Sequence, residues 1–214
     1  MLASTLLGLL SCSTLALPVT AEQRGVGSAA TLAPRSAQSS LALAELVRAA
    51  TAADHAAFAE LYQRFARAVH AVVLTKVAAQ DAGDIVQEVF ATVYRQLARL
   101  EDPNAFPGWI IVIARRRAID HLRQRNVRPE ASADPDDIAA NVGAQDAAID
   151  TARALAAIRS LPEAYAETLM MRLVEGLTGP EIAERTGLAP GSVRVNLCRG
   201  MALLRNALAD GGAR

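Results

Sequence analysis

Arginine side chains gather in one short stretch of this sequence. Residues 109–128, WIIVIARRRAIDHLRQRNVR, contain six arginines and a single aspartate. A guanidinium group carries a planar fork of N–H donors that can bond two phosphate oxygens at once, so this stretch indicates binding to a polyanion. The chain offers no nucleophile with an adjacent base, no metal-ligand cluster and no glycine-rich phosphate loop. We therefore predict a binding protein rather than an enzyme, with no cofactor and no metal site.

A second candidate site lies in residues 181–205. The spacing predicts a short helix, a tight turn at Gly187 and a longer helix with one apolar side. Such a helix-turn-helix can place its second helix in the DNA major groove, where an arginine can bond guanine and an asparagine adenine. A helical hairpin that only packs is the alternative. The candidate DNA contacts are Arg185, Ser192, Arg194, Asn196 and Arg199.

A polar ridge is expected on an earlier amphipathic helix, which starts near residue 84. Its members are spaced by three, four and eleven residues from the first one, so they share one helical face. They are Asp84, Gln87, Glu88 and Arg95, with Thr92 on the same side. A solvated face is the usual meaning of this spacing, and a partner surface is the alternative.

The arginine-rich helix begins with aromatic residues. Phe106 and Trp109 can stack on exposed bases, as aromatic side chains do in single-strand binders, or can pack in the core. Arg116 and Arg123 are expected to face phosphate. Arg115 lies above Ile119 on a more buried side, where it can instead pair with a carboxylate of the protein itself.

The remaining pattern predicts an all-α chain of two small helical domains. Ala, Leu, Arg and Glu favour helix, and no run of β-branched residues suggests a sheet. Net charge is zero, which taken alone argues against a nucleic-acid binder, but residues 129–150 carry six acidic groups and no basic ones, so the charges are segregated. We interpret residues 41–128 and 151–210 as the two domains and 129–150 as a flexible acidic linker between them.

The first 40 residues have no clear place in this organisation. The run from Leu6 to Cys12 resembles a signal peptide or lipoprotein box, yet no Lys or Arg precedes Arg24 and the run is too short to span a bilayer. We predict a disordered or misassigned extension, with an exported or lipid-anchored protein as the alternative. The two cysteines, Cys12 and Cys198, do not make a disulfide framework, so we expect a cytoplasmic protein without membrane insertion.

Three stretches in this order resemble the extracytoplasmic-function sigma factors of bacterial RNA polymerase. The resemblance covers residues 41–209. It implies that DIVQEVF (84–90) docks on core polymerase and that FPGWIIVIARRRAIDHLR (106–123) melts and reads the minus-ten promoter element. It also implies that residues 161–197 read the minus-thirty-five element and that the loop 101–107 holds a flipped base, with Asn104 as its reader. The implied partners are core polymerase, promoter DNA and an anti-sigma factor.

Some positions depart from the family pattern. Arg116 stands where an Asn is usual, Gly179-Pro180 replaces a polar-aromatic pair, and Val195-Asn196 replaces a Ser or Thr followed by Arg. The expected mechanism is bivalent, because a tether raises the effective concentration of the second contact. A stand-alone helix-turn-helix regulator is the alternative function, and it differs in binding promoters tightly without polymerase.

Overall fold

The structure, a computed structural model, describes residues 35–127 and 142–210. These residues form helices joined by turns, with no β-strand among them, so the all-α prediction is confirmed. The N-terminal unit (residues 35–127) consists of α2 (Arg35–Thr51), α3 (His55–Leu74), α4 (Ala79–Gln96) and α5 (Phe106–Val127). The C-terminal unit (residues 142–210) consists of α6 (Val142–Arg159), α7 (Glu163–Leu169), α8 (Gly179–Thr186) and α9 (Pro190–Asp210).

Two of the predicted domain boundaries lie within helices. α2 starts at Arg35, before the predicted start at residue 41, and α6 starts at Val142, inside the segment predicted as a linker. The run from Leu6 to Cys12 and most of the predicted linker lie outside the described residues. Within those residues, no helix is both long enough and apolar enough to cross a membrane.

The central helix of the N-terminal unit is α3. The residue before this helix, Asp54, is its N-cap. The Asp54 carboxylate accepts hydrogen bonds from the backbone N–H groups of Ala56 and Ala57, as expected for aspartate at this position. Along the helix, Leu61 and Phe65 are completely buried. The Phe65 ring meets Phe106 of α5 edge to face, with ring centroids 5.0 Å apart. This contact fixes the start of α5 against the core.

Proline separates α4 from α5. A 3₁₀ turn, η1 (Leu97–Arg99), ends α4, and a second one, η2 (Pro103–Ala105), leads into α5. The Asp102 carboxylate accepts a hydrogen bond from the Asn104 backbone N–H at 2.9 Å and so caps the second turn. Proline lacks the N–H that a helix interior needs, so the break between α4 and α5 is confirmed.

The C-terminal unit is built around the contact of α7 with α9. Gly200 of α9 lies so close to Leu169 that a Cβ atom at this position would come within 3.1 Å of the leucine side chain. After α7 the chain makes a π-helical turn, η3 (Met170–Val174), and Gly176 follows with a positive φ of 66°. Glycine adopts that conformation without steric cost, and the chain can therefore reverse toward α8.

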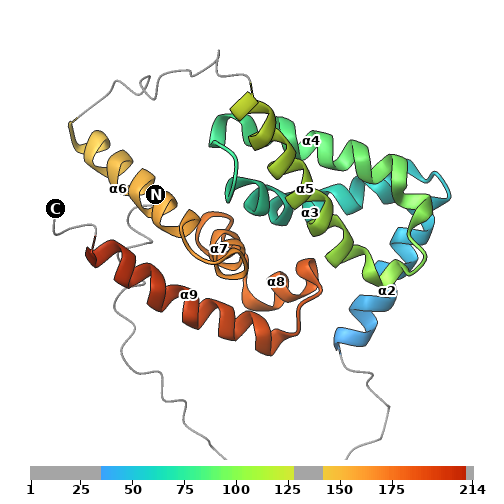
Figure 1. The fold of residues 1–214 in the computed structure, drawn as a ribbon. Helices are drawn as coiled ribbons and strands as arrows, with labels where there is room; N and C mark the ends of the chain where they lie inside the picture. The colour runs from blue at the N-terminus through green and yellow to red at the C-terminus, as the bar shows by residue number, and fades with distance from the viewer. Residues whose placement is uncertain (1–34, 128–141, 211–214) are drawn as a thin grey trace, which may run out of the picture.

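The two units pack against each other. In Figure 1, α7 and α8 lie beside α3 and α5, and one apolar cluster contains buried residues of both units. The cluster includes Phe65 and Ile110 from the first unit and Ile158, Leu177 and Ile182 from the second. The two predicted helical units are therefore present, and the described residues show them in direct contact.

Replacing Phe106 with Ala should destabilise the protein strongly, because the ring is fully buried and its removal leaves a cavity beside Phe65. We expect a loss of about 3–5 kcal/mol in the free energy of unfolding, measured by urea titration. Leu122→Ala is the control, since this side chain is 42% exposed, and it should cost less than about 0.5 kcal/mol. A similar small loss for Phe106→Ala would contradict the packing.

Candidate nucleic-acid interface

The polar ridge on α4 faces solvent. Asp84, Gln87, Glu88 and Arg95 are exposed, while Ile85 and Val89 on the other side are buried. The predicted amphipathic division of this helix is therefore seen in the structure. A row of exposed carboxylate and amide groups on one helix can contact a basic partner surface.

Thr92 differs from the expectation. The sequence pattern predicts Thr92 on the same side as the polar ridge, but only 4% of the surface of this residue is exposed. Its hydroxyl donates to the Glu88 carbonyl at 2.8 Å and accepts from Arg117 Nη2 at 2.9 Å and from Arg95 Nη2 at 3.3 Å. Thr92 thus joins α4 to α5 through its hydrogen bond with Arg117. No sequence pattern had indicated a role for Arg117.

The arginines of α5 are divided between solvent and the protein interior. Arg116 and Arg123 are exposed, as predicted for phosphate contacts. Arg115 instead meets the C-terminal unit. Its guanidinium donates to the two carboxylate oxygens of Glu167 at 2.6 and 2.8 Å and lies 3.1 Å from Glu163.

This pairing changes what Arg115 can do. The hydrogen bond to Glu167 raises the pKa of the arginine, so its charge is firmly held and is already neutralised by a carboxylate. Of the two alternatives for Arg115, pairing with a carboxylate of the protein itself is the one seen in this structure. A phosphate contact does not fit this arrangement.

The aromatic residues at the start of α5 also differ from each other. Phe106 is completely buried, so its predicted stacking on a base does not fit this arrangement, and the core alternative holds for this ring. Trp109 is half-buried and lies 6.1 Å from Phe106 between ring centroids, so part of its surface stays open to solvent. Asn104 is exposed, with its side-chain amide 3.1 Å from Asp102.

α8 and α9 form the predicted pair of helices around Gly187. That glycine ends α8 in the left-handed conformation, with φ of 73°, and Val193 of α9 is buried against the first helix. Ser192, Arg194 and Arg199 of α9 are exposed, and the spacing of seven residues places Ser192 and Arg199 on the same face of the helix. All three side chains are thus accessible to a partner.

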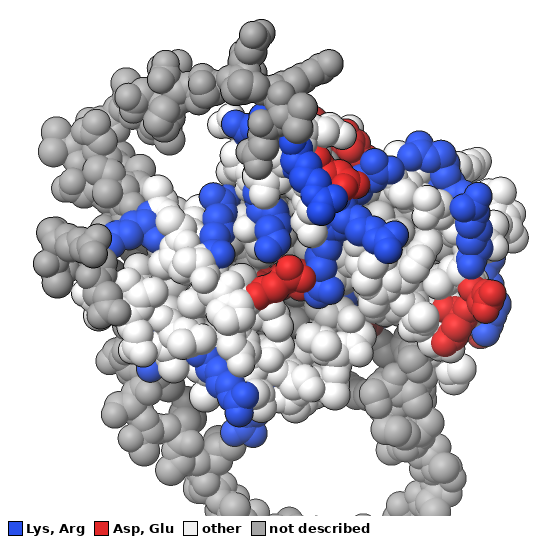
Figure 2. Space-filling model, in the orientation of Figure 1, with Lys and Arg blue, Asp and Glu red and all other residues white. Residues whose placement is uncertain are grey.

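Two predicted contacts of the helix-turn-helix point elsewhere. Arg185 is only 16% exposed in its side chain, and its Nε donates to the Arg64 carbonyl of α3 at 2.7 Å. Asn196 is half-buried, with its amide nitrogen 3.5 Å from the Thr168 hydroxyl. On the face drawn in Figure 2, basic side chains outnumber acidic ones.

A capping box starts α8. The Thr178 hydroxyl accepts from the Glu181 backbone N–H, and the Glu181 carboxylate accepts from the Thr178 backbone N–H and hydroxyl, both at 2.7 Å. These bonds, the backbone one first, hold the pKa of Glu181 below its ordinary value of 4.5. Pro180 fits the first turn because its missing N–H has no helical partner there, which explains how Gly179-Pro180 is accommodated.

Comparisons with known proteins agree with this geometry. Two family models match the chain, Sigma-70 region 2 at residues 61–128 and Sigma-70 region 4 at residues 151–204. These matches define the chain as a sigma factor of bacterial RNA polymerase. The N-terminal unit contains region 2 and the C-terminal unit contains region 4.

Individual relatives show which group of sigma factors the chain resembles. The ECF RNA polymerase sigma factor RpoE of Cereibacter sphaeroides is 37% identical over 146 residues, which are 66% of this chain and 80% of the relative. The RNA polymerase sigma factor CarQ of Myxococcus xanthus is 31% identical over 72% of this chain and 90% of its own. The chain belongs to the extracytoplasmic-function sigma factors of RNA polymerase.

A solved structure supports the fold. CnrH, in complex with the cytosolic domain of CnrY, aligns with a TM-score of 0.52 at 23% identity and covers 79% of this chain and 98% of its own. The similarity at this level of identity concerns the arrangement of helices.

Thr178→Ala should destabilise the protein by about 1 kcal/mol at neutral pH, because the N-terminal N–H groups of α8 lose their cap. The pKa of Glu181 is lowered in the folded protein, so its stabilising contribution is present above the unfolded value and is lost as pH falls through the lower folded value. The cost of the substitution should therefore shrink when unfolding is measured below pH 4.5.

Thr51→Ala provides the control for this measurement. The Thr51 hydroxyl donates to a backbone carbonyl, that of Val47, at 2.8 Å. Its effect on the free energy of unfolding should be the same at both pH values. An equal loss of the Thr178→Ala and Thr51→Ala effects in acid would contradict the role of the carboxylate.

Proposed function

We propose that this sigma factor binds core RNA polymerase through the polar ridge of α4 and brings it to promoters that α5 and α9 read. The observation that carries the proposal is the joint exposure of three polar surfaces on rigid helices: the α4 ridge, Arg116 and Arg123 of α5, and the outer side of α9 from Ser192 to Arg199. Core polymerase and promoter DNA are then the two partners, and the cytoplasm is the compartment that holds both.

The proposed division of labour follows from the chemistry of each surface. Asp84, Gln87 and Glu88 offer acceptors to a basic helix surface of the polymerase. Arg116 and Arg123 follow the phosphates of the minus-ten strand, while half-buried Trp109 and exposed Asn104 border the place where an unpaired base is held. Holding a base out of the duplex costs a few kcal/mol of unstacking, which the bound polymerase helps to offset.

The minus-thirty-five element is the proposed target of α9. Its N-terminal residues enter the major groove, where Arg194 can bond guanine and Ser192 a phosphate. Arg199 is also exposed, two turns beyond Ser192 on the same face of the helix. An anti-sigma protein is a further proposed partner, in line with the family resemblance. Run-off transcription with purified core polymerase on a promoter library tests the whole proposal, and silence with every promoter while a control sigma factor works would refute it.

Glu88→Arg should weaken binding to core polymerase by roughly 10-fold, because the reversed charge repels the basic partner surface while the exposed position spares the fold. The affinity can be measured by fluorescence titration of labelled sigma factor with core enzyme. Glu45→Arg applies the same reversal at an exposed position of α2 and should leave the affinity unchanged. Equal affinities of both variants would refute the placement of the polymerase surface on α4.

Arg194→Ala should weaken promoter binding in the presence of core polymerase by about 1–3 kcal/mol and relax the base preference at one position of the minus-thirty-five element. Arg205→Ala removes an exposed arginine from the far half of the same helix and should have little effect. Binding is measured by gel shift on promoter fragments, with and without core enzyme. Tight, specific binding without core enzyme would instead favour the stand-alone regulator.

A further inference from the structure

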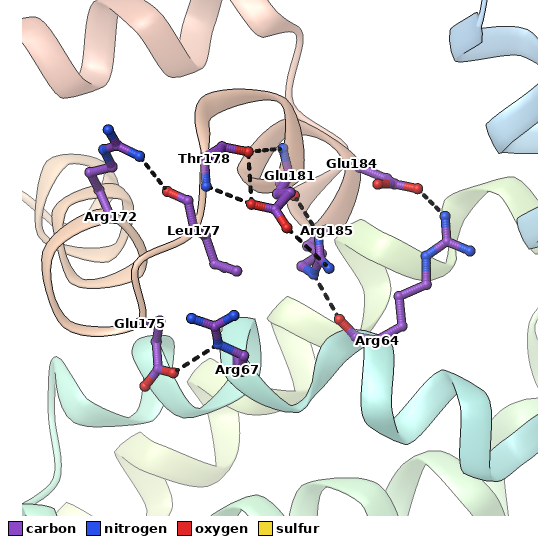
Figure 3. A network of polar contacts seen from close by, with 9 residues as sticks. All are labelled: Arg64, Arg67, Arg172, Glu175, Leu177, Thr178, Glu181, Glu184 and Arg185. Carbon is purple, nitrogen blue, oxygen red and sulfur yellow. Dashed lines mark hydrogen bonds and ion pairs between the residues drawn. The ribbon is translucent and has the colours of Figure 1, made fainter.

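The first helix of the helix-turn-helix, α8, uses its polar side chains for contacts within the protein. Glu184 pairs with Arg64 of α3, and Arg185 donates to the Arg64 carbonyl at 2.7 Å, as Figure 3 shows. Glu181 forms the capping box with Thr178 at the start of the helix. These groups of α8 are occupied in the fold, so α9 is the helix left to contact base edges.

The exposed face of α9 has an apolar side chain in its middle. Val195 is 45% exposed, and it lies three residues after Ser192 and four before Arg199, so the three side chains share one face of the helix. The next residue, Asn196, is half-buried, with its amide nitrogen 3.5 Å from the Thr168 hydroxyl of α7. Between Ser192 and Arg199, this face therefore presents the methyl groups of a valine instead of a hydrogen-bonding group.

Packing does not account for a valine at position 195, because nearly half of its surface stays exposed. Val193, two residues earlier, is buried and does fill space against α8. A β-branched side chain also loses rotamer freedom in a helix, so valine favours helix less than alanine or arginine does. The position lies in the second turn of α9, in the N-terminal part that a recognition helix directs at base edges. A contact outside the protein is therefore the role that fits this side chain.

The charges around Val195 indicate which partner fits this face. Residues 190–209 contain three arginines and no acidic residue. Arg194 and Arg199, which are both exposed, lie before and after Val195 along the helix. Their guanidinium groups can bond phosphates or guanine, while the valine between them faces the floor of the major groove. Duplex DNA thus matches this face in charge.

Among the four bases, only thymine carries a methyl group in the major groove. The other bases are distinguished there by their hydrogen-bond donors and acceptors, which a valine cannot bond. Contact between the valine and the thymine C5 methyl group removes both apolar surfaces from water, and this burial is favourable in proportion to the area involved. Val195 is therefore suited to prefer thymine at one base pair.

We propose that Val195 is a specificity-determining residue, which reads one thymine of the minus-thirty-five element through its C5 methyl group. The inference rests on the proposed function of α9 and adds a base preference to it. Phosphate contacts by neighbouring side chains position the helix on the duplex but carry no sequence information themselves. The apolar contact of Val195 adds such information at a position where no hydrogen bond is made by this side chain.

Deoxyuridine tests the contact, because it lacks only the C5 methyl group of thymine and keeps its hydrogen-bonding groups. The protein in complex with core polymerase is titrated with a promoter fragment identified by run-off transcription, in which each thymine of the minus-thirty-five element is replaced singly on either strand. At one position the affinity should fall by about 4-fold, as expected for one methyl group that is no longer buried. An element without thymine, or affinities within about 1.5-fold at every position, would overturn the proposal.

Val195→Ala should bind the thymine promoter about 3- to 5-fold more weakly, and it should no longer distinguish thymine from deoxyuridine at that position. The exposed position and the high helix propensity of alanine spare the fold, which circular dichroism and thermal unfolding check. Equal weakening on the thymine and deoxyuridine promoters would overturn the proposal, since the side chain would then act through a protein contact or through the fold. A thymine preference that persists in Val195→Ala would overturn it as well.

Leu203→Ala is the matched control. It removes an apolar side chain that is 38% exposed in the far half of the same helix. Both the affinity and the preference for thymine over deoxyuridine should stay as they are in the unmodified protein. Loss of the preference in Leu203→Ala would contradict the assignment to Val195.

The two proposals fail in different ways. If the protein supports no transcription on any promoter while a control sigma factor is active, the proposed function fails. If a promoter is bound and transcribed but its thymines can all be replaced by deoxyuridine without loss of affinity, only the reading of thymine by Val195 fails.

Discussion

Glu167 is a nearly buried carboxylate whose side chain is only 6% exposed, and it can stay ionised there because Arg115 reaches it from the other unit. An unpaired charge at this depth costs several kcal/mol, so the ion pair and the contact between units require each other. The Arg115–Glu167 pair gives α5 one orientation relative to α7. The ion pairs between α3 and the C-terminal unit, and the position of the turn at Gly187 beside Pro107, agree with that orientation.

A bivalent protein on a loose tether would show two units without contact between them. The described residues instead show units that share an apolar cluster and exchange ion pairs, while the ridge of α4 faces solvent. Most of these ion pairs keep some exposure to water, so each contributes little alone. The interface between the units therefore depends on the apolar cluster together with several such pairs.

Local chemistry made much of the fold predictable. The apolar spacing of α3, α4 and α9, the cap at Asp54 and the prolines between α4 and α5 act within a few residues of each other, and each feature appears as expected. Pairs such as Arg115 with Glu167 leave no periodic trace, because 52 residues separate them. Phe106 and Trp109 illustrate a second limit of sequence-based prediction. An aromatic side chain can pack in a core or stack on a base, and the sequence alone does not show which of the two it does.

The seating of Arg115 on Glu163 and Glu167 has a chemical consequence beyond this chain. A pair of carboxylates presents oxygens to a guanidinium much as a phosphodiester does, so Arg115 already has within the chain the kind of partner that a phosphate would offer. A polymer with closely spaced anionic groups, such as heparin, would have to displace these two acids before it could bond this guanidinium.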